Sequence, residues 1–298
     1  MPEKEKIGIV TDSGSMISPE IAEQLGVEVV PLWVHFGNDP KDSHNDHQIT
    51  AADIKRIFAE KRGKVYPHTS SPSPGEFVVA YDRKLDLGAD QIISIHIARG
   101  IREGTFNAAT AAAKEVQRNH ELPENAIKVF DSKQVALATG FLVREAVDLI
   151  TRGEDFQAVT SQLENMRTRL RTVGTFRNLK WARKTSSIPG WLLWLCQTAI
   201  LSPLKLSPII QIVNGDWTKW PLARPKKPLA MQRIAEIVLS SGKFEKAEIF
   251  HFDAHNEAEK LAFHIEKAEG YKPEIVEVPA SIAAGAGPGA VGICLLEK

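Results

Sequence analysis

The sequence predicts an α/β protein of two domains, the first with a parallel sheet (residues 1–153) and the second with a mixed sheet (residues 154–298). Short apolar runs alternate with amphipathic segments through the first half, which is typical of a parallel sheet built from strand–helix units. The second half contains Asn214-Gly215 between two apolar runs, the strongest short signal for an antiparallel hairpin. A length of 298 residues is enough for two domains.

The first domain is expected to begin with a buried strand at Ile7–Thr11 and to continue in strict alternation. This strand ends in the polar turn Asp12–Ser15, and open α/β sheets bind ligands at such strand ends. The following elements are expected in this order: a helix after Ser18-Pro19, a strand at 27–34, a polar loop at 38–48, a helix from Thr50, a helix from Ser73, a strand at 91–97, a helix at 105–118, a strand at 127–130 and a helix ending near Arg152.

A serine- and threonine-rich stretch, Pro67–Phe77, precedes one of these helices. Ser73 is a good N-cap, Pro74 suits the first helical position and Glu76 completes a capping box. Three hydroxyl groups, at residues 69–71, therefore lie just ahead of a helix N-terminus, where free N–H groups favour an anion. Neutral donors of this kind suit holding a carboxylate; a well-capped loop without a ligand is the alternative.

The second domain is expected to combine helices with an antiparallel hairpin. Its most apolar run, Gly190–Leu204, is shorter than the roughly 20 residues that span a bilayer, and suits a buried helix or the wall of an apolar cavity. The other elements are expected in this order: a helix at 156–171, a strand at 172–176, a segment at 180–187, the hairpin at 209–220, a helix at 227–241, a strand at 247–252, a helix at 255–268 and a segment at 281–296 that glycines interrupt.

Composition excludes several classes of protein. Lys+Arg and Asp+Glu are equal at 37 each, so no overall basic field attracts nucleic acid. Cys196 and Cys294 are too far apart for a disulfide framework, which fits a reducing cytoplasm. The N-terminal residues form no apolar leader, so a cytoplasmic protein is expected.

Motifs for cofactors and metals are weak. Gly285–Ala290 fits G-x-G-x-x-A, but only eight residues follow it, so its glycines more simply let the backbone pass close to another segment. His44 and His47 lie among aspartates and could bind a divalent cation, although a solvated loop is the simpler interpretation. We therefore expect no cofactor and no metal. Asp12 could be a catalytic carboxylate, but such a residue more often ties down its own turn.

Six motifs together resemble the DegV family over residues 7–296. In chain order they are Ile7–Ser15, Thr69–Ser73, Ser94–Thr105 with Phe106–Ala108, Val129–Ser132, Ser207–Ile210 with Asn214-Gly215, and Gly287–Ala290. The resemblance implies a fatty-acid carrier with a deep apolar tunnel between two α/β domains. In bacteria the best-understood members present the fatty acid to a separate kinase, which phosphorylates the carboxylate. A fatty acid and a kinase subunit are then the expected partners, without nucleic acid or membrane spanning, and transient membrane contact stays open.

The resemblance also implies a set of carboxylate-binding positions, and several of them depart from the family's pattern. Thr69 and Ser70 are retained. Ala98-Arg99 replaces a serine pair, Ser187 replaces an arginine and Gly285 replaces a histidine; Ser207 stands where a lysine is common. The predicted ligand-binding positions are thus Thr69, Ser70, Ala98, Arg99, Ser187 and Gly285.

Two interpretations of these departures remain open. Arg99 could compensate, because a guanidinium can hold a carboxylate through two hydrogen bonds; the alternative is an exposed loop residue. The tunnel could also survive while the head-group chemistry or the partner has changed. Two functions of another class are a hydrolase or transferase for a small anionic substrate, using Asp12 and the serine-rich loop, and an interaction protein without a ligand.

Overall fold

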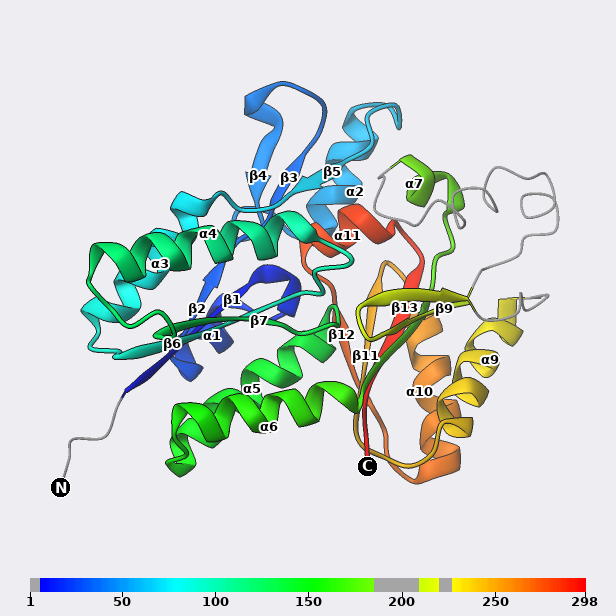
Figure 1. Ribbon diagram of the computed structural model, residues 1–298. Helices are drawn as coiled ribbons and strands as arrows, with labels where there is room; N and C mark the ends of the chain where they lie inside the picture. The colour runs from blue at the N-terminus through cyan, green and yellow to red at the C-terminus, as the bar shows by residue number, and fades with distance from the viewer. Residues whose placement is uncertain (1–5, 185–208, 220–226) are drawn as a thin grey trace. The chain divides into compact units, whose positions relative to one another are not determined.

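Two compact units make up the computed structural model, which describes residues 6–184, 209–219 and 227–298 (Figure 1). Unit 1 consists of Met1–Trp33 and Ser70–Thr168, and unit 2 consists of Val34–Thr69 and Arg169–Lys298. Each unit is thus assembled from two separate segments, whereas the division predicted at residues 153/154 cuts the chain once. The predicted apolar run at residues 190–204 lies outside the described residues.

Unit 1 is built on a four-stranded sheet in the order β2-β1-β6-β7, and every pairing in it is parallel. The strands are β1 (Ile7–Asp12), β2 (Val27–Val30), β6 (Gln91–His96) and β7 (Ile127–Asp131). The helices are α1 (Pro19–Leu25), α3 (Pro74–Asp86), α4 (Glu103–Asn119), α5 (Leu137–Arg152) and α6 (Phe156–Thr168). The predicted parallel α/β sheet is confirmed.

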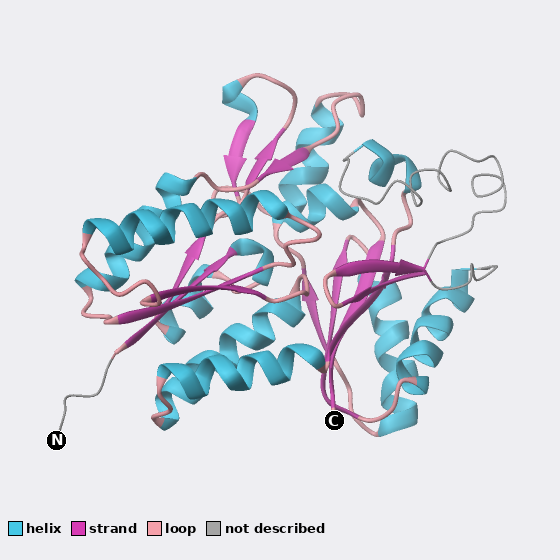
Figure 2. Cartoon of the chain, in the orientation of Figure 1, coloured by secondary structure: helices cyan, strands magenta, loops and turns pink. Residues whose placement is uncertain are grey.

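Helices cover both faces of this sheet, with α3 and α4 on one side and α5 and α6 on the other (Figures 1 and 2). On the α3/α4 side, Phe77 and Tyr81 pack with four buried alanines of α4: Ala108, Ala109, Ala112 and Ala113. Small side chains on α4 let it approach the neighbouring helix closely. The central strand β6 is buried from Ile92 to His96, as expected for a strand with helices on both faces.

The predicted start of α3 is confirmed in detail. The Ser73 hydroxyl accepts the N–H of Glu76 (3.3 Å), and the Glu76 carboxylate accepts the N–H of Ser73 (2.7 Å). This capping box fixes the point at which the hydroxyl-rich stretch becomes helix.

Unit 2 contains a six-stranded mixed sheet in the order β10-β9-β8-β13-β11-β12, in which the β11–β12 pair is parallel. Its strands are β8 (Leu170–Thr175), β9 (Ile209–Val213), β10 (Asp216–Lys219), β11 (Phe244–Phe252), β12 (Glu274–Glu277) and β13 (Ala290–Glu297). The helices α9 (Lys227–Ser240) and α10 (His255–Glu269) pack on it. The predicted hairpin is confirmed, and its turn residues Asn214 and Gly215 both have positive φ.

A three-stranded sheet in the order β4-β3-β5 corrects two predictions. Its strands are β3 (Trp33–His35), β4 (Ser43–Asn45) and β5 (His68–Ser70). The segment 27–34, predicted as one strand, is broken between β2 and β3 at Pro31, which has no N–H to donate to a strand ladder. The segment 38–48, predicted as a loop, contains β4 and a short 3₁₀ turn, η2 (Pro40–Asp42). No helix in the described part of the chain is long and apolar enough to cross a membrane.

Unit 2 also holds three short or medium helices around one buried tryptophan. They are α2 (Ala51–Glu60), α7 (Leu179–Lys184) and α11 (Ala280–Ala286). The Trp181 ring lies against Phe58 and Tyr66, and its Nε1 donates to the Ala284 carbonyl (2.8 Å). A Cβ on Gly287, whose φ is +76°, would lie 2.6 Å from that ring. The predicted role in close backbone approach is confirmed for Gly287 and Gly289, where a Cβ would meet Trp181 and Arg177, but not for Gly285.

We expect Gly287→Ala to destabilise the protein by about 1–3 kcal/mol, because the methyl group meets Trp181 and the backbone lies in the left-handed region. Gly285→Ala is the matched control: it lies two residues earlier in α11, and nothing is within 4 Å of its Cβ. Alanine there should be neutral or stabilising by up to about 1 kcal/mol. Urea unfolding measures both, and equal midpoints for the two variants would contradict this packing.

Candidate functional site

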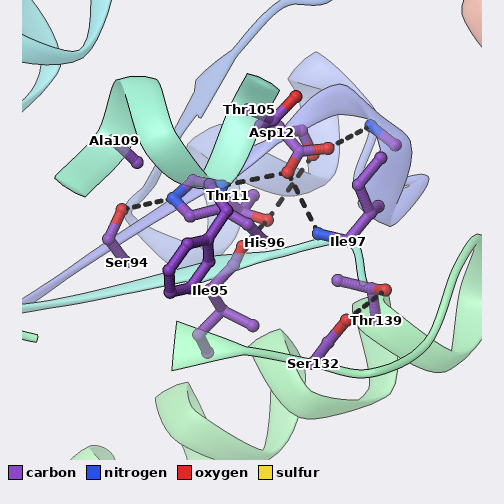
Figure 3. A network of polar contacts seen from close by, with 12 residues as sticks. Thr11, Asp12, Ser94, Ile95, His96, Ile97, Thr105, Ala109, Ser132 and Thr139 are labelled. Carbon is purple, nitrogen blue, oxygen red and sulfur yellow. Dashed lines mark hydrogen bonds and ion pairs between the residues drawn. The ribbon is translucent and has the colours of Figure 1, made fainter. Parts of the chain in front are cut away.

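Asp12 lies at the carboxyl end of β1 and is completely buried. Its Oδ1 accepts the N–H of Gly14 (2.9 Å), and its Oδ2 accepts the N–H of Ile97 (3.2 Å) and contacts Nδ1 of His96 (2.9 Å) (Figure 3). A carboxylate can only accept, so Nδ1 of His96 carries the proton in this pair. One side chain therefore joins the turn after β1 to the end of β6.

The hydrogen-bonded chain continues from His96 into the sheet. Nε2 of His96 lies 2.7 Å from the Ser94 hydroxyl, which accepts a hydrogen bond from the Tyr81 hydroxyl (2.9 Å). Burial raises the pKa of Tyr81 far above its ordinary value, so this hydroxyl stays protonated and remains a donor. The second contact of the Tyr81 hydroxyl is the Ala109 carbonyl (3.3 Å), and the Phe77 ring packs nearly perpendicular to the imidazole (5.0 Å between centroids).

Serine, histidine and aspartate in this hydrogen-bonding order resemble the contacts of a hydrolase triad. Ser94, His96 and Asp12 are each 0% exposed, however, so a substrate has no access to the hydroxyl. The sequence left two roles open for Asp12, a catalytic carboxylate or a residue that holds its own turn. Its burial and its hydrogen bond from the Gly14 N–H favour the second role. His96 and Ser94 were not predicted as functional residues, although two polar residues at i and i+2 in the apolar strand QIISIHI are a usable signal for a buried polar pair.

The hydroxyl-rich stretch meets the start of α4. Thr69 and Ser70 lie on β5 and are half-buried. The next hydroxyl, that of Ser71, accepts a hydrogen bond from the buried Thr105 in the first turn of α4 (3.0 Å). A Cβ on Gly104 would lie 2.8 Å from the Ser71 oxygen, so glycine permits this approach. Among the described residues no side chain caps α4, which leaves the positive end of its dipole in the turn that contacts Ser71.

The remaining predicted ligand-binding residues differ in their surroundings. Ala98 is buried, and its N–H donates to the Gln134 carbonyl (2.8 Å). The Arg99 side chain is 54% exposed, with its guanidinium 3.4 Å from the Glu103 carboxylate and over the Phe106 ring. This position agrees with the alternative of an exposed loop residue, and a role for Arg99 in binding stays a prediction. Ser70, Ala98 and Arg99 belong to unit 1, Thr69 and Gly285 belong to unit 2, and Ser187 lies outside the described residues.

The histidine- and aspartate-rich stretch considered for a metal is tied into unit 2. The Asp42 carboxylate pairs with Lys61 (2.6 Å), and that of Asp46 accepts the N–H of Ser281 (2.6 Å). No group of three or more potential metal ligands occurs among the described residues. Each of these two aspartates therefore has a structural partner within its own unit.

A histidine pair lies directly beside Thr69. The rings of His35 on β3 and His68 on β5 are 5.0 Å apart, and Nδ1 of His35 lies 2.8 Å from the Ser43 hydroxyl. Burial first, and then the neighbouring His68, lower the pKa of His35 below its ordinary value. The pairing of β3 with β5 thus places His35, whose neutral form is favoured, across from the strand that carries the predicted ligand residue Thr69.

Comparison with known proteins identifies a family for this chain. The family model described as "Uncharacterised protein, DegV family" matches residues 6–298. Protein DegV of Bacillus subtilis is 31% identical over 301 residues, which cover 98% of this chain and 99% of that protein. The solved structure "Fatty Acid Binding of a DegV family Protein from Thermus thermophilus" has a TM-score of 0.83 at 26% identity and covers 98% of this chain and 100% of that one.

A second solved structure, "Crystal Structure of DegV, a fatty acid binding protein from Bacillus subtilis", has a TM-score of 0.79 at 29% identity and covers 99% of this chain and 100% of that one. The family predicted from the motifs is confirmed. The two solved structures are described as fatty-acid-binding proteins, in agreement with the binding class predicted for this chain.

We expect acid to weaken the three-stranded sheet. The folded-state pKa of His35 lies below its ordinary value of about 6.5, so the unfolded chain binds its proton more tightly. The stability that this site contributes is complete above about pH 6.5 and decreases as the pH falls through the folded-state pKa. Thermal unfolding between about pH 7.5 and 5.5, together with an NMR titration of His35, measures both effects.

His68→Gln is the control for this prediction, because it removes the second cause of the shift. The pKa of His35 should then rise toward its ordinary value, and the loss of stability in acid should be smaller than in the wild type. A His35 that titrates at or above its ordinary pKa in the wild type would show that the expected direction is wrong.

Proposed function

The chain belongs to the DegV family, and from this premise we propose that it binds one long-chain fatty acid and holds the acyl chain in an apolar tunnel. The observation that carries the proposal is the match of the entire described fold to two fatty-acid-binding relatives, at 26% and 29% identity. The hydroxyl groups and the helix start described above supply the kind of donors that a carboxylate requires.

Thr69 and Ser70 are the proposed partners of the carboxylate. Ser71 is already paired with Thr105, which fixes the path of the chain immediately after Ser70. The uncapped first turn of α4 adds a positive dipole end, which favours an anion. Arg99 would have to leave Glu103 to take part, so the proposal rests on the hydroxyls, with Ala98, Ser187 and Gly285 as further positions of the head-group region.

The acyl chain supplies most of the binding free energy in this proposal. Burying each CH₂ contributes about 0.8 kcal/mol, so a long chain provides a large gross driving force before association costs. A hydrogen bond to a charged group contributes about 1.5–3 kcal/mol. The hydroxyls therefore set orientation and discrimination between fatty acids and uncharged lipids more than they set the total affinity.

We further propose that the bound fatty acid is presented to a separate kinase in the cytoplasm. Phosphorylation of the carboxylate requires a nucleotide site, which the second protein would supply. Ser187 and Gly285 stand where the family's pattern has an arginine and a histidine. The chain can therefore retain acyl binding and still lose phosphoryl transfer, so the two are tested separately. Incubating the loaded protein with a fatty acid kinase and ATP, and analysing for acyl phosphate, tests the transfer alone.

Native mass spectrometry of the purified protein, followed by organic extraction, tests the proposed binding. We expect one fatty acid per chain. A protein that is empty and also takes up no added palmitate would remove the carrier function. The two remaining hypotheses would then be separated by screening small anionic esters and phosphates for turnover, which only the hydrolase or transferase would show.

We expect Thr69→Val to accelerate palmitate loss about tenfold or more, because the valine removes one donor to the carboxylate and keeps the side-chain shape. Thr110→Val is the matched control: Thr110 is also half-buried, and its hydroxyl donates to the Phe106 carbonyl within α4 (2.8 Å). Dissociation measured by transfer to albumin should be unchanged in the control. Equal dissociation rates in both variants would take Thr69 out of the site.

A further inference from the structure

We propose that Asp12 is a positioning residue for the fatty-acid site, acting through Ile97 and His96 on the segment from residue 97 to residue 105. This inference rests on the proposed function and adds to it a buried group that does not touch the ligand. The proposed site needs the start of α4 at a fixed place, and the contacts of Asp12 supply the anchor.

The first step is the cost of the buried charge. Asp12 is 0% exposed and accepts three hydrogen bonds, from Gly14, Ile97 and His96. A buried carboxylate is tolerated when several hydrogen-bond donors surround it, as these three do. Without the carboxylate, each of the three donors would lose this partner. The position of Ile97 is thus coupled to that of the β1 turn.

The second step follows the chain from Ile97 to the hydroxyls. The Ala98 carbonyl accepts the N–H groups of Ile101 (2.9 Å) and Arg102 (2.9 Å), which forms the turn that leads into α4. The first turn of α4 then contains Thr105, whose hydroxyl donates to Ser71. These hydrogen bonds, together with the short stretches of backbone between them, link Asp12 to the residue that follows Ser70.

The third step is the orientation of His96. Tyr81 donates to the Ser94 hydroxyl, which lies 2.7 Å from Nε2 of His96, while Nδ1–H of His96 is directed at Asp12. Both ring nitrogens therefore have a polar partner. The imidazole is consequently held in one orientation, with its Nδ1–H donor on the carboxylate of Asp12.

Palmitate retention in four variants tests the inference. Asp12→Asn removes the charge, and His96→Leu removes the side-chain donor. In His96→Asn the side-chain amide takes the place of Nδ1–H, so it keeps the donor to Asp12 and gives up the contact with Ser94. Thr11→Val is the matched control, because Thr11 is equally buried and its hydroxyl joins β1 to the Ile95 carbonyl (2.7 Å) without contacting Asp12's carboxylate or the 97–105 segment.

We expect Asp12→Asn and His96→Leu to release palmitate about tenfold faster than Thr11→Val, and His96→Asn to remain close to the wild type. Hydrogen exchange at the Ile97 amide should be faster in Asp12→Asn and unchanged in Thr11→Val. The urea midpoint of each variant measures its loss of stability, and palmitate retention is compared between variants whose midpoints are similar. If Asp12→Asn does not fold, the comparison of His96→Leu with His96→Asn decides.

Equal retention in Asp12→Asn and Thr11→Val, or in His96→Leu and His96→Asn, would overturn the inference and leave the proposed function intact. A wild-type protein that binds no palmitate would overturn the proposed function, and this inference with it. The two failures are distinguishable because the first appears only between variants and the second appears in the wild type.

Discussion

A carboxylate that is out of reach of water must be surrounded by donors, and the strand ends of unit 1 are arranged to meet this requirement. Asp12 brings together the turn after β1 and the exit of β6, two segments 84 residues apart in the chain. The polar side chains behind it, from His96 to Tyr81, are each paired. This junction fixes the position of the helix that begins at Glu103, and with it the contact between Thr105 and Ser71.

Much of the fold follows from local patterns that the sequence displays. The capping box at Ser73, the Asn214-Gly215 turn and the alternation of strands with helices each depend on residues close together in the chain. The strands β4 and β5 have three residues each, too few for a periodic pattern, and both were missed as strands. The break at Pro31 follows from its missing N–H, but the separate sheet that β3 joins does not follow from the residues around it.

The residues of the candidate site divide in the same way, into those marked by local patterns and those joined by distant contacts. Thr69 and Ser70 stand out through composition and through the helix start that follows them. The pairing of Ser71 with Thr105 was not foreseen, because 34 residues separate the two and sequence spacing carries no information on such a contact. His96 reads as one polar residue in an apolar strand, and its partners Asp12 and Tyr81 belong to other elements. Arg99, a candidate through its place in the family's pattern and its guanidinium chemistry, has Glu103 four residues away as its partner.

The division into units has a consequence for how the protein can be taken apart. The chain passes from one unit to the other after Trp33, after Thr69 and after Thr168. No single proteolytic cut, and no single truncation of the gene, can yield unit 1 as one continuous polypeptide. A permuted or spliced chain that links residue 33 directly to residue 70 would be required. That splice would remove Thr69 while retaining Ser70, so the isolated unit would carry only half of the hydroxyl pair.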